Sequence, residues 1–535
     1  MNEPTESLPP GWTAFPIEEL FQPLADGRTL HHGWSPQCDK DPAADGEWGV
    51  LKTTAVQDGA YLSEHNKRLP TKLKPRAHFE VKQGDLLITC AGPRVRCGVP
   101  CLVRETRDRL ILSGKMYRFR VLPEVIDSRY MEAYLRSPET QRLIDKMKTG
   151  ISDSGLNLTH GRFFTLQVPV APPAEQRRIV AKIEELLSDL DAGVAALTRV
   201  KANLKRYRAS VLKAAIEGRL TAAWRKRNPA TEPAVELLER ILSEYRSKWE
   251  QNPLLKRAGV GKASRRGSRG AYSSAALPVG QALAVTPKEW TWASAEQLCG
   301  AITKGTTPPQ DDLLDGAGDI PFIKIYNLTR TGRLDFDKKP TFISRETHGR
   351  GVMVRSRVLP GDVLMNIVGP PLGKVSVVPE LFPEWNVNQA IAILRPLRGV
   401  LSSYLACALL TPSVLVRATS RAKATAGQHN LTLEIVRELP VPLPPTSEQA
   451  QIVAEVDRRL SVADAAETQI EHALQRAARL RQAILKRAFE GKLVLQDPTD
   501  EHEAAMPSRS GTIQSKPTPE ARRVVRRGRG KNVTA

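Results

Sequence analysis

The chain has 535 residues, too many for one ordinary domain, and 41% of them are hydrophobic, so we expect two or more folded units and exclude disorder of the whole chain. Six cysteines exclude a disulfide scaffold, and neither a signal peptide nor a membrane-spanning apolar run is found, which predicts a cytoplasmic protein without a membrane partner. The net charge of +21 favours a polyanionic partner, most often nucleic acid.

Residues 1–170 are expected to form a mixed α+β domain. Short runs rich in strand-forming residues, such as Asp85–Thr89 and Tyr117–Val121, are separated by glycine and proline. A short helical stretch follows at Ser128–Arg136. This pattern predicts a curved or barrel-like sheet accompanied by helices.

Residues 171–222 are expected to form one long helix, which begins at Pro172-Pro173 and ends at Gly218. Its apolar residues recur about every 3.6 positions, which is typical of a coiled-coil stripe. They are Ile179, Ile183, Leu186, Leu190, Val194, Leu197, Val200, Leu204, Tyr207 and Val211. A single helix cannot bury such a stripe, so the pattern predicts a partner.

Residues 223–285 connect the two halves of the chain. A shorter amphipathic helix is expected over Ala222–Ser247, with an apolar face formed by Val235, Leu238, Ile241 and Tyr245. A basic linker then follows.

Much of the positive charge lies in two low-complexity segments. Residues 254–276 carry six basic and no acidic residues, and residues 506–535 carry eight basic residues and one acid. Both segments can also be interpreted as solvated linkers, so the charge alone does not prove nucleic-acid binding.

The second half of the chain repeats the first. The string L-x-V-P…E-Q-x-x-I-V at residues 166–180 returns at 439–453, and Asn157-Leu-Thr returns at Asn430 with the same spacing. Further matches upstream follow in the same order with small changes of spacing. These matches indicate an internal duplication.

The repeat divides the second half like the first: a mixed domain at 286–443, a second long helix at 444–495 and a disordered basic tail at 496–535. Thr446 and Gln449 fit a capping box at the start of the helix. Its stripe is rich in alanine, so the simplest partner of each stripe is the other. The alternative is that each helix packs on its own domain or on another subunit.

Motifs for catalysis and cofactors are not found. Residues 369–375 are one residue short of a phosphate-binding loop, and the Pro-Pro pairs lack the amide or carboxylate of a base-methylation motif. Cys90, Cys97 and Cys101 fit no common zinc spacing. We therefore expect a binding protein with no catalytic residue, no metal and no cofactor of its own.

Two mixed domains, each followed by a long helix that opens with V-P…E-Q-x-x-I and closes with L-K-x-A-x-E-G-x-L, resemble the specificity subunits of type I restriction-modification systems. Strings such as Gly46-Glu-Trp-Gly-Val-Leu-Lys52 and Gly305-Thr-Thr-Pro308 extend the resemblance over nearly the whole chain. The basic linker and tail are not part of that pattern.

This resemblance implies an α+β protein with two target-recognition domains, separated by an antiparallel two-helix coiled coil and related by a pseudo-twofold axis. Each domain would read one half of a split, asymmetric sequence in double-stranded DNA, and the helices would fix the spacing. Two modification (methyltransferase) subunits would bring S-adenosylmethionine. Restriction (translocase and nuclease) subunits would bring ATP and Mg²⁺.

Candidate DNA-binding residues combine side chains suited to base edges (Arg, Asn, Gln) with side chains suited to phosphates (Lys, Thr). In the first domain they are Lys52, Thr53, Arg94, Arg96, Lys115 and Asn157. In the second domain they are Lys304, Thr306, Lys324, Asn327, Asn388, Gln389 and Asn430. Asn157 and Asn430 recur in both copies, so a structural role is expected for them.

Three other interpretations remain open. The chain could serve a stand-alone adenine methyltransferase complex without a nuclease. It could be a self-sufficient DNA-modifying enzyme whose site carries no recognisable motif. It could also be a structural coiled-coil protein whose duplicated domains bind other proteins.

Overall fold

The computed structural model describes residues 8–229, 232–251, 285–369, 372–421, 423–425 and 428–500. The chain divides into two compact units: unit 1 contains Met1–Val194 and Gln475–Ala535, and unit 2 contains Ala195–Leu474. The two long helices, α4 (Pro173–Ile216) and α13 (Thr446–Phe489), contribute to both units. The basic linker at 254–276 and nearly all of the predicted tail lie outside the described residues.

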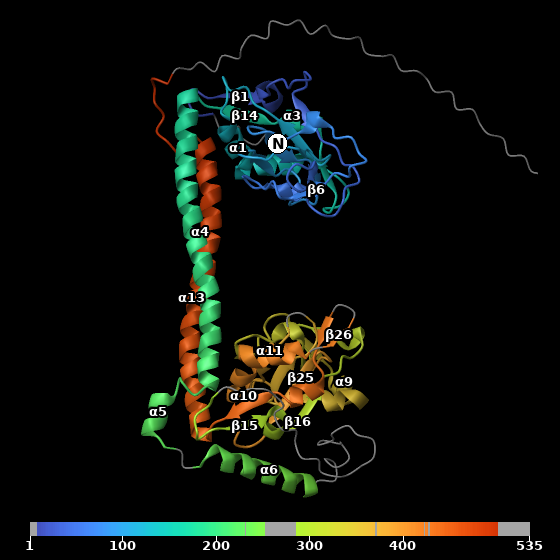
Figure 1. Ribbon diagram of the computed structural model, residues 1–535, viewed down its shortest axis with the longest axis vertical. Helices are drawn as coiled ribbons and strands as arrows, with labels where there is room; N and C mark the ends of the chain where they lie inside the picture. The colour runs from blue at the N-terminus through green and yellow to red at the C-terminus, as the bar shows by residue number, and fades with distance from the viewer. Residues whose placement is uncertain are drawn as a thin grey trace, which may run out of the picture. The chain divides into compact units, whose positions relative to one another are not determined.

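Unit 1 combines short, mostly antiparallel sheets with helices, drawn in blue to teal in Figure 1. Its central sheet has the order β2-β11-β7-β9, formed by Leu30–His32, Met116–Phe119, Leu86–Thr89 and Pro100–Leu102. A second sheet, β10-β3-β6, is formed by Leu110–Ile111, Gly49–Leu51 and Asn66–Arg68. The smaller sheets are β12-β13-β8 (Lys148–Thr149, Leu156–Leu158, Ala91–Gly92), β4-β5 (Val56–Gln57, Ala60–Tyr61) and β1-β14 (Thr13–Pro16, Gln167–Val170). The helices are α1 (Ser128–Arg136), α2 (Pro138–Met147) and α3 (His160–Phe164), with 3-10 turns η1 (Ile17–Leu20), η2 (Thr53–Ala55) and η3 (Ala77–Phe79).

Unit 2 contains two larger sheets. The sheet β16-β25-β22-β23-β19 is formed by Cys299–Lys304, Ile391–Pro396, Val363–Asn366, Val375–Val377 and Gly332–Arg333. The sheet β17-β20-β18-β24-β21 is formed by Leu314–Asp315, Thr341–Ile343, Ile320–Ile323, Trp385–Val387 and Arg357–Val358. Two strand pairs, β15-β28 (Thr291–Ser294, Pro440–Leu443) and β26-β27 (Lys423–Thr425, Gln428–Asn430), complete it. The helices are α8 (Ala295–Leu298), α9 (Arg345–Gly349), α10 (Ser402–Leu409), α11 (Pro412–Ser420) and α12 (Leu433–Arg437), with 3-10 turns η4 (Gln310–Asp312), η5 (Ile325–Asn327) and η6 (Gly351–Ser356).

The predicted α+β class is confirmed, and the repeat is visible in the strand pairing. In each unit the first strand pairs antiparallel with the strand just before the long helix, as β1 with β14 and β15 with β28. Ala91 pairs with Asn157 in unit 1, and the corresponding Val368 bridges to Asn430 in unit 2. Both repeated asparagines therefore occupy the same position on a strand.

In unit 1 the start of α4 packs beside the end of α13. Ile179 and Ile183 of α4 share one hydrophobic core with Ile484 and Ala488 of α13. An ion pair between Asp191 and Arg481 joins the same two segments. Residue numbers rise along α4 while they fall along α13, so the two segments run antiparallel within unit 1.

In unit 2 the end of α4 packs beside the start of α13. Ile216 shares a core with Ile452, and Arg208 donates to Asp464 and, at 2.8 Å, to Glu467. The predicted stripe is not buried throughout, because Val200 and Tyr207 remain 46% and 41% exposed. The helix ends are as predicted: Gly218 and Gly491 both have φ +68°, the left-handed conformation that glycine adopts after a helix.

Two local predictions are wrong. The helix expected over Ala222–Ser247 is two helices, α5 (Ala222–Arg227) and α6 (Ala234–Gln251), since Pro233 lies immediately before α6. Its apolar face is also shifted, because Val235 is exposed and Leu237 is buried.

The expected capping box at Thr446 and Gln449 does not form. Gln449 instead uses its amide to bond residues outside the helix. None of the described helices is both long and apolar enough to cross a membrane.

Candidate nucleic-acid interface

A buried tryptophan–glutamate contact anchors each long helix to its own unit. The Trp12 indole Nε1 donates to Glu175 at 3.0 Å, and the Trp290 indole donates to Glu448 at 2.8 Å. Both carboxylates are 2% exposed. The repeated glutamate of the E-Q string therefore fixes the helix to the strand-rich part of the unit.

The repeated glutamine makes a second anchor. The Gln176 amide donates to the Val125 carbonyl at 2.9 Å and accepts from the Asp127 backbone N–H at 2.9 Å. Gln449 repeats this with the Gly399 carbonyl at 3.0 Å and the Leu401 N–H at 2.9 Å. The strings shared by both halves are thus a framework that holds two units in the same internal geometry.

The candidate residues of unit 1 lie around the loop at 93–97. Arg96, however, uses its guanidinium for hydrogen bonds within the protein. Its guanidinium donates to the carbonyls of Val56 (2.7 Å) and Thr53, and to Gln57 Oε1 (3.1 Å). Arg94 is 45% exposed and pairs with Asp145 (2.7 Å) and Asp153 (3.0 Å). Arg96 is therefore a brace between two loops.

Lys115 and Asn157 are exposed and lie on elements that border this loop. The Lys115 carbonyl accepts from the N–H of Cys90, and Asn157 pairs with Ala91 on β8. Lys52 is partly exposed and immediately precedes η2. These three remain candidates for DNA contact.

The candidates of unit 2 gather where β16, β18 and β24 end. The Thr306 N–H donates to the Val387 carbonyl at 3.0 Å, and the Asn388 N–H donates to the Ile323 carbonyl at 3.1 Å. These contacts bring Lys304, Lys324 and Gln389 to one edge, because Lys304 lies two residues before Thr306 and the other two directly follow Ile323 and Asn388. Lys304 and Gln389 are exposed.

Two candidate asparagines of unit 2 have buried side-chain atoms. Asn327 is fully buried, its amide donates to the carbonyls of Asp335 and Lys338 at 3.0 Å each, and its oxygen accepts from the Lys324 N–H. Asn430 has a buried side-chain oxygen with no hydrogen bond among the described residues. Asn327 has no free polar atom to offer to a base.

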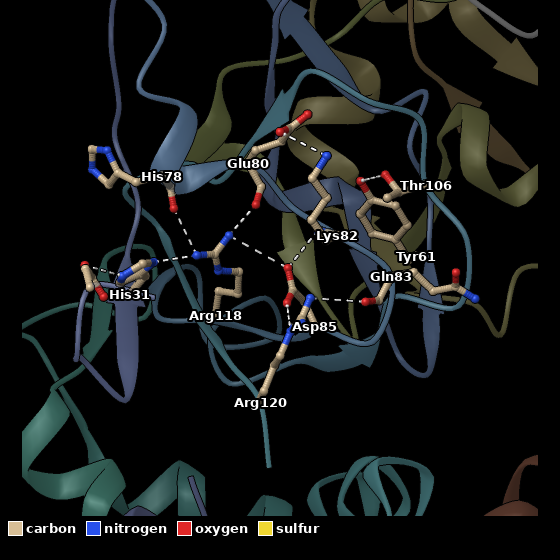
Figure 2. Close-up of polar contacts among 11 residues, drawn as sticks. His31, Tyr61, His78, Glu80, Lys82, Gln83, Asp85, Thr106, Arg118 and Arg120 are labelled. Atoms are coloured by element: carbon tan, nitrogen blue, oxygen red, sulfur yellow. Dashed lines mark hydrogen bonds and ion pairs between the residues drawn. The ribbon is translucent and has the colours of Figure 1, made fainter. Parts of the chain in front are cut away.

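Sequence reasoning missed a buried polar network in unit 1, shown in Figure 2. Arg118, 7% exposed, donates to the carbonyls of His78 (3.0 Å) and Glu80 and to His31 Nδ1 (2.5 Å). Because an arginine can only donate, His31 must carry its proton on Nε2, which lies 2.8 Å from Asp26. Burial lowers the pKa of His31 and that of Arg118.

A charged pair next to this network recurs in unit 2. Asp85, in the repeated Gly-Asp string, accepts from Arg120 Nε at 2.7 Å, and Asp362 accepts from Arg395 Nε at 2.8 Å. The sequence does carry one sign of this network, the alternation Tyr117-Arg118-Phe119-Arg120. Two arginines in a strand-like run need acidic or carbonyl partners.

The described residues contain no group of three or more His, Cys, Asp or Glu side chains that could hold a metal ion. Cys90, Cys97 and Cys101 are buried free thiols. Burial raises the pKa of Cys90 to about 12, as expected for neutral core thiols.

The fold and this framework describe an internally duplicated protein, in which each α+β unit packs against segments of both long helices. Residues 287–476 match the family described as "Type I restriction modification DNA specificity domain". The specificity subunit of the Escherichia coli type I restriction enzyme EcoEI is 35% identical over 36% of this chain and 31% of its own length. That of the E. coli enzyme EcoBI is 27% identical over 64% of this chain and 62% of its own length.

A solved structure from a study of complex assembly and conformational transition in a type I restriction-modification system covers 91% of this chain and 99% of its own, with a TM-score of 0.56 at 20% identity. This likeness concerns the fold. The matched regions span less than two thirds of the EcoEI and EcoBI subunits. The match to this family is carried by residues 287–476, and the chain is similar to type I restriction-modification specificity subunits.

Proposed function

We propose that this chain supplies DNA sequence specificity to a type I restriction-modification complex. One observation carries the proposal: the two units share the same anchoring framework but present different side chains on their loops. The exposed candidates are Arg94 and Lys115 in unit 1 and Lys304 and Gln389 in unit 2, which differ in type and in position on the fold. Two such units would read two different half-sites, so the DNA target would be split and asymmetric.

Base recognition would take place in the major groove, where each base pair has its own pattern of donors and acceptors. Exposed lysines such as Lys115 and Lys304 suit the phosphates, which position a protein without specifying sequence. DNA as the target would also place the working complex in the cytoplasm.

The two long helices would act as the spacer between half-sites. The antiparallel contacts found separately within each unit support this role. If so, inserting one heptad into one helix keeps the apolar stripe in phase and should change the spacer while both half-sites stay the same. Sequencing of methylated sites in cells would reveal the new spacing, and an unchanged spacing contradicts the spacer role.

The proposed partners are two modification subunits and the restriction subunits. Val462 and Leu480 on α13 and Val200 on α4 are apolar and exposed, which supports docking of other chains along the helices. S-adenosylmethionine would be bound by the modification subunits, and ATP and Mg²⁺ by the restriction subunits. This chain would carry no catalytic group.

The test compares the chain alone with the chain assembled with its modification subunits. We expect methyl transfer to adenine only from the assembly, at one bipartite sequence. Methyl transfer by the lone chain would instead indicate a self-sufficient enzyme. An assembly without any DNA preference would indicate a structural coiled-coil protein. Full modification in a cell that encodes no restriction subunit would indicate a stand-alone methyltransferase complex.

A further inference from the structure

Two aliphatic side chains of unit 1 project into solvent from neighbouring loops. Ile151, between β12 and β13, is fully exposed, and Val95, after β8, is 81% exposed. The loops lie together because the Arg94 N–H donates to the Asp153 carbonyl at 2.9 Å. Aliphatic groups exposed on adjoining loops favour a partner surface.

The loops are braced from below, so these side chains are presented in a defined position. The Arg94 guanidinium binds Asp153 and Asp145, and Lys148 Nζ donates to the Arg94 carbonyl at 3.0 Å. Gly150, at φ +146°, sits so close to the Gly155 carbonyl oxygen that a Cβ would approach it to 2.7 Å. The hairpin therefore depends on glycine at this turn.

The surroundings of this apolar pair are cationic. Lys115, Lys146 and Arg162 are exposed and form no ion pair within the described part of the chain. All three are near the two loops: Lys146 lies just before β12, Arg162 donates to the Met147 carbonyl, and the Lys115 carbonyl accepts from the Cys90 N–H. The cores of protein–protein interfaces are depleted of lysine, whereas DNA-binding faces are enriched in cations.

We infer that the β12–β13 hairpin enters the DNA major groove and that Ile151, supported by Val95, recognises the C5-methyl group of a thymine. The groove admits a two-stranded ribbon, and the thymine methyl is the apolar group that a base pair presents there. The cations around the loops would hold the flanking phosphates. This inference rests on the proposed function and adds one base to the half-site read by unit 1.

The experiment uses the chain assembled with its modification subunits and a duplex that carries the methylated target found in cells. Each thymine of the target is replaced in turn by deoxyuridine, which removes only the methyl group. At one thymine of one half-site we expect binding to weaken about fourfold, the effect of one buried methyl-sized group. In Ile151→Ala this position should lose its sensitivity, and affinity for the unmodified duplex should fall.

Leu381→Ala is the matched control, because Leu381 is a 70% exposed aliphatic residue of unit 2. It should keep the full response to deoxyuridine. The inference is overturned if every thymine-to-deoxyuridine change has the same effect on wild type and on Ile151→Ala. It is also overturned if Ile151→Ala binds DNA normally but assembles poorly with the modification subunits. If the wild-type assembly shows no sequence preference at all, the proposed function itself fails.

Discussion

The two tryptophan–glutamate anchors differ in how their buried charge is compensated. In unit 2, Glu448 also accepts from Thr221 Oγ1 at 2.6 Å and from Arg225 Nε at 2.9 Å. In unit 1, Glu175 receives the indole of Trp12, and its Oε1 is buried without a hydrogen bond among the described residues. At the repeat spacing, Val494 and Pro498 stand where Thr221 and Arg225 would be. Both copies therefore have the tryptophan–glutamate hydrogen bond, but only the glutamate of unit 2 has an arginine partner among the described residues.

The largest expected effect follows from removing the compensated charge. Glu448→Gln leaves the Arg225 guanidinium, 17% exposed, without its carboxylate, and should lower the free energy of unfolding of unit 2 by about 3–5 kcal/mol. Glu175→Gln removes no ion pair and should change stability by about 1 kcal/mol or less. Urea unfolding measures both. Equal losses in the two variants would contradict the difference between the anchors, and Glu448→Gln/Arg225→Met should recover part of the loss.

Two basic residues near the candidate DNA face of unit 1 should differ in what they do. Arg96 should stabilise the fold, and Lys115 should contact DNA. Arg96→Met removes three hydrogen bonds to neutral acceptors and should destabilise unit 1 by about 2–3 kcal/mol. Lys115→Met should leave stability within about 0.5 kcal/mol. It should instead reduce the slope of log affinity against log salt by about 0.9, the effect of one lost phosphate contact. A Lys115→Met protein with an unchanged salt slope would remove this lysine from the interface.

These contrasts also show where sequence reasoning reaches its limit. The helix at Ser128–Arg136 and the glycines that end α4 and α13 follow from local rules, because turn and capping preferences act within a few residues. Arg96 and Lys115 look alike in the sequence. Their difference arises because the loop at 53–57 folds back over Arg96, about forty positions away. Burial of a charge depends on such distant contacts.

The same limit applies to the E-Q string. The glutamate is identical in both copies, yet its electrostatic partners come from residues 221 and 225, more than two hundred positions before Glu448. The repeated string gives no sign of this difference, and the structure shows an ion-pair partner for Glu448 and none for Glu175 among the described residues. The polar network around Arg118 escaped prediction for the same reason, since its acceptors are mostly backbone carbonyls.

A pair of buried histidines extends the comparison to acid sensitivity. His31 and His348 are both 4% exposed, and burial lowers the pKa of each. His31 Nδ1 faces the Arg118 guanidinium, whereas His348 Nδ1 faces the Asn386 amide at 3.1 Å. The Asn386 amide carries an oxygen that a flip would present to a protonated ring, at the expense of its bonds to the Met353 carbonyl and the Val387 N–H, whereas a guanidinium offers no acceptor.

Protonation should therefore destabilise unit 1 more than unit 2. Because folding depresses the pKa of both histidines, their contribution is complete above the unfolded value of about 6.5 and is lost as pH falls towards the lower folded value. Between pH 7 and 5 the free energy of unfolding should fall more steeply with His31 present than in His31→Gln, and the matching difference for His348→Gln should be smaller. If the free energy of unfolding changes with pH equally in the two variants, burial of the histidine, and not the group that faces its Nδ1, determines the acid sensitivity.

The smallest effect concerns Glu175 itself. Burial raises the pKa of this carboxyl above its ordinary value of 4.5, so the folded state binds the proton more tightly than the unfolded chain. The resulting penalty is present at neutral pH and disappears as pH falls below the unfolded value. Glu175→Gln mimics the protonated group, so it should be more stable than wild type by up to about 1 kcal/mol at pH 7 and equal to it near pH 4. Glu448→Gln should show no such gain at any pH, because it removes the ion pair with Arg225. If wild type is instead more stable than Glu175→Gln at pH 7, the buried Glu175 carboxylate must be stabilised by a positive charge, as Glu448 is.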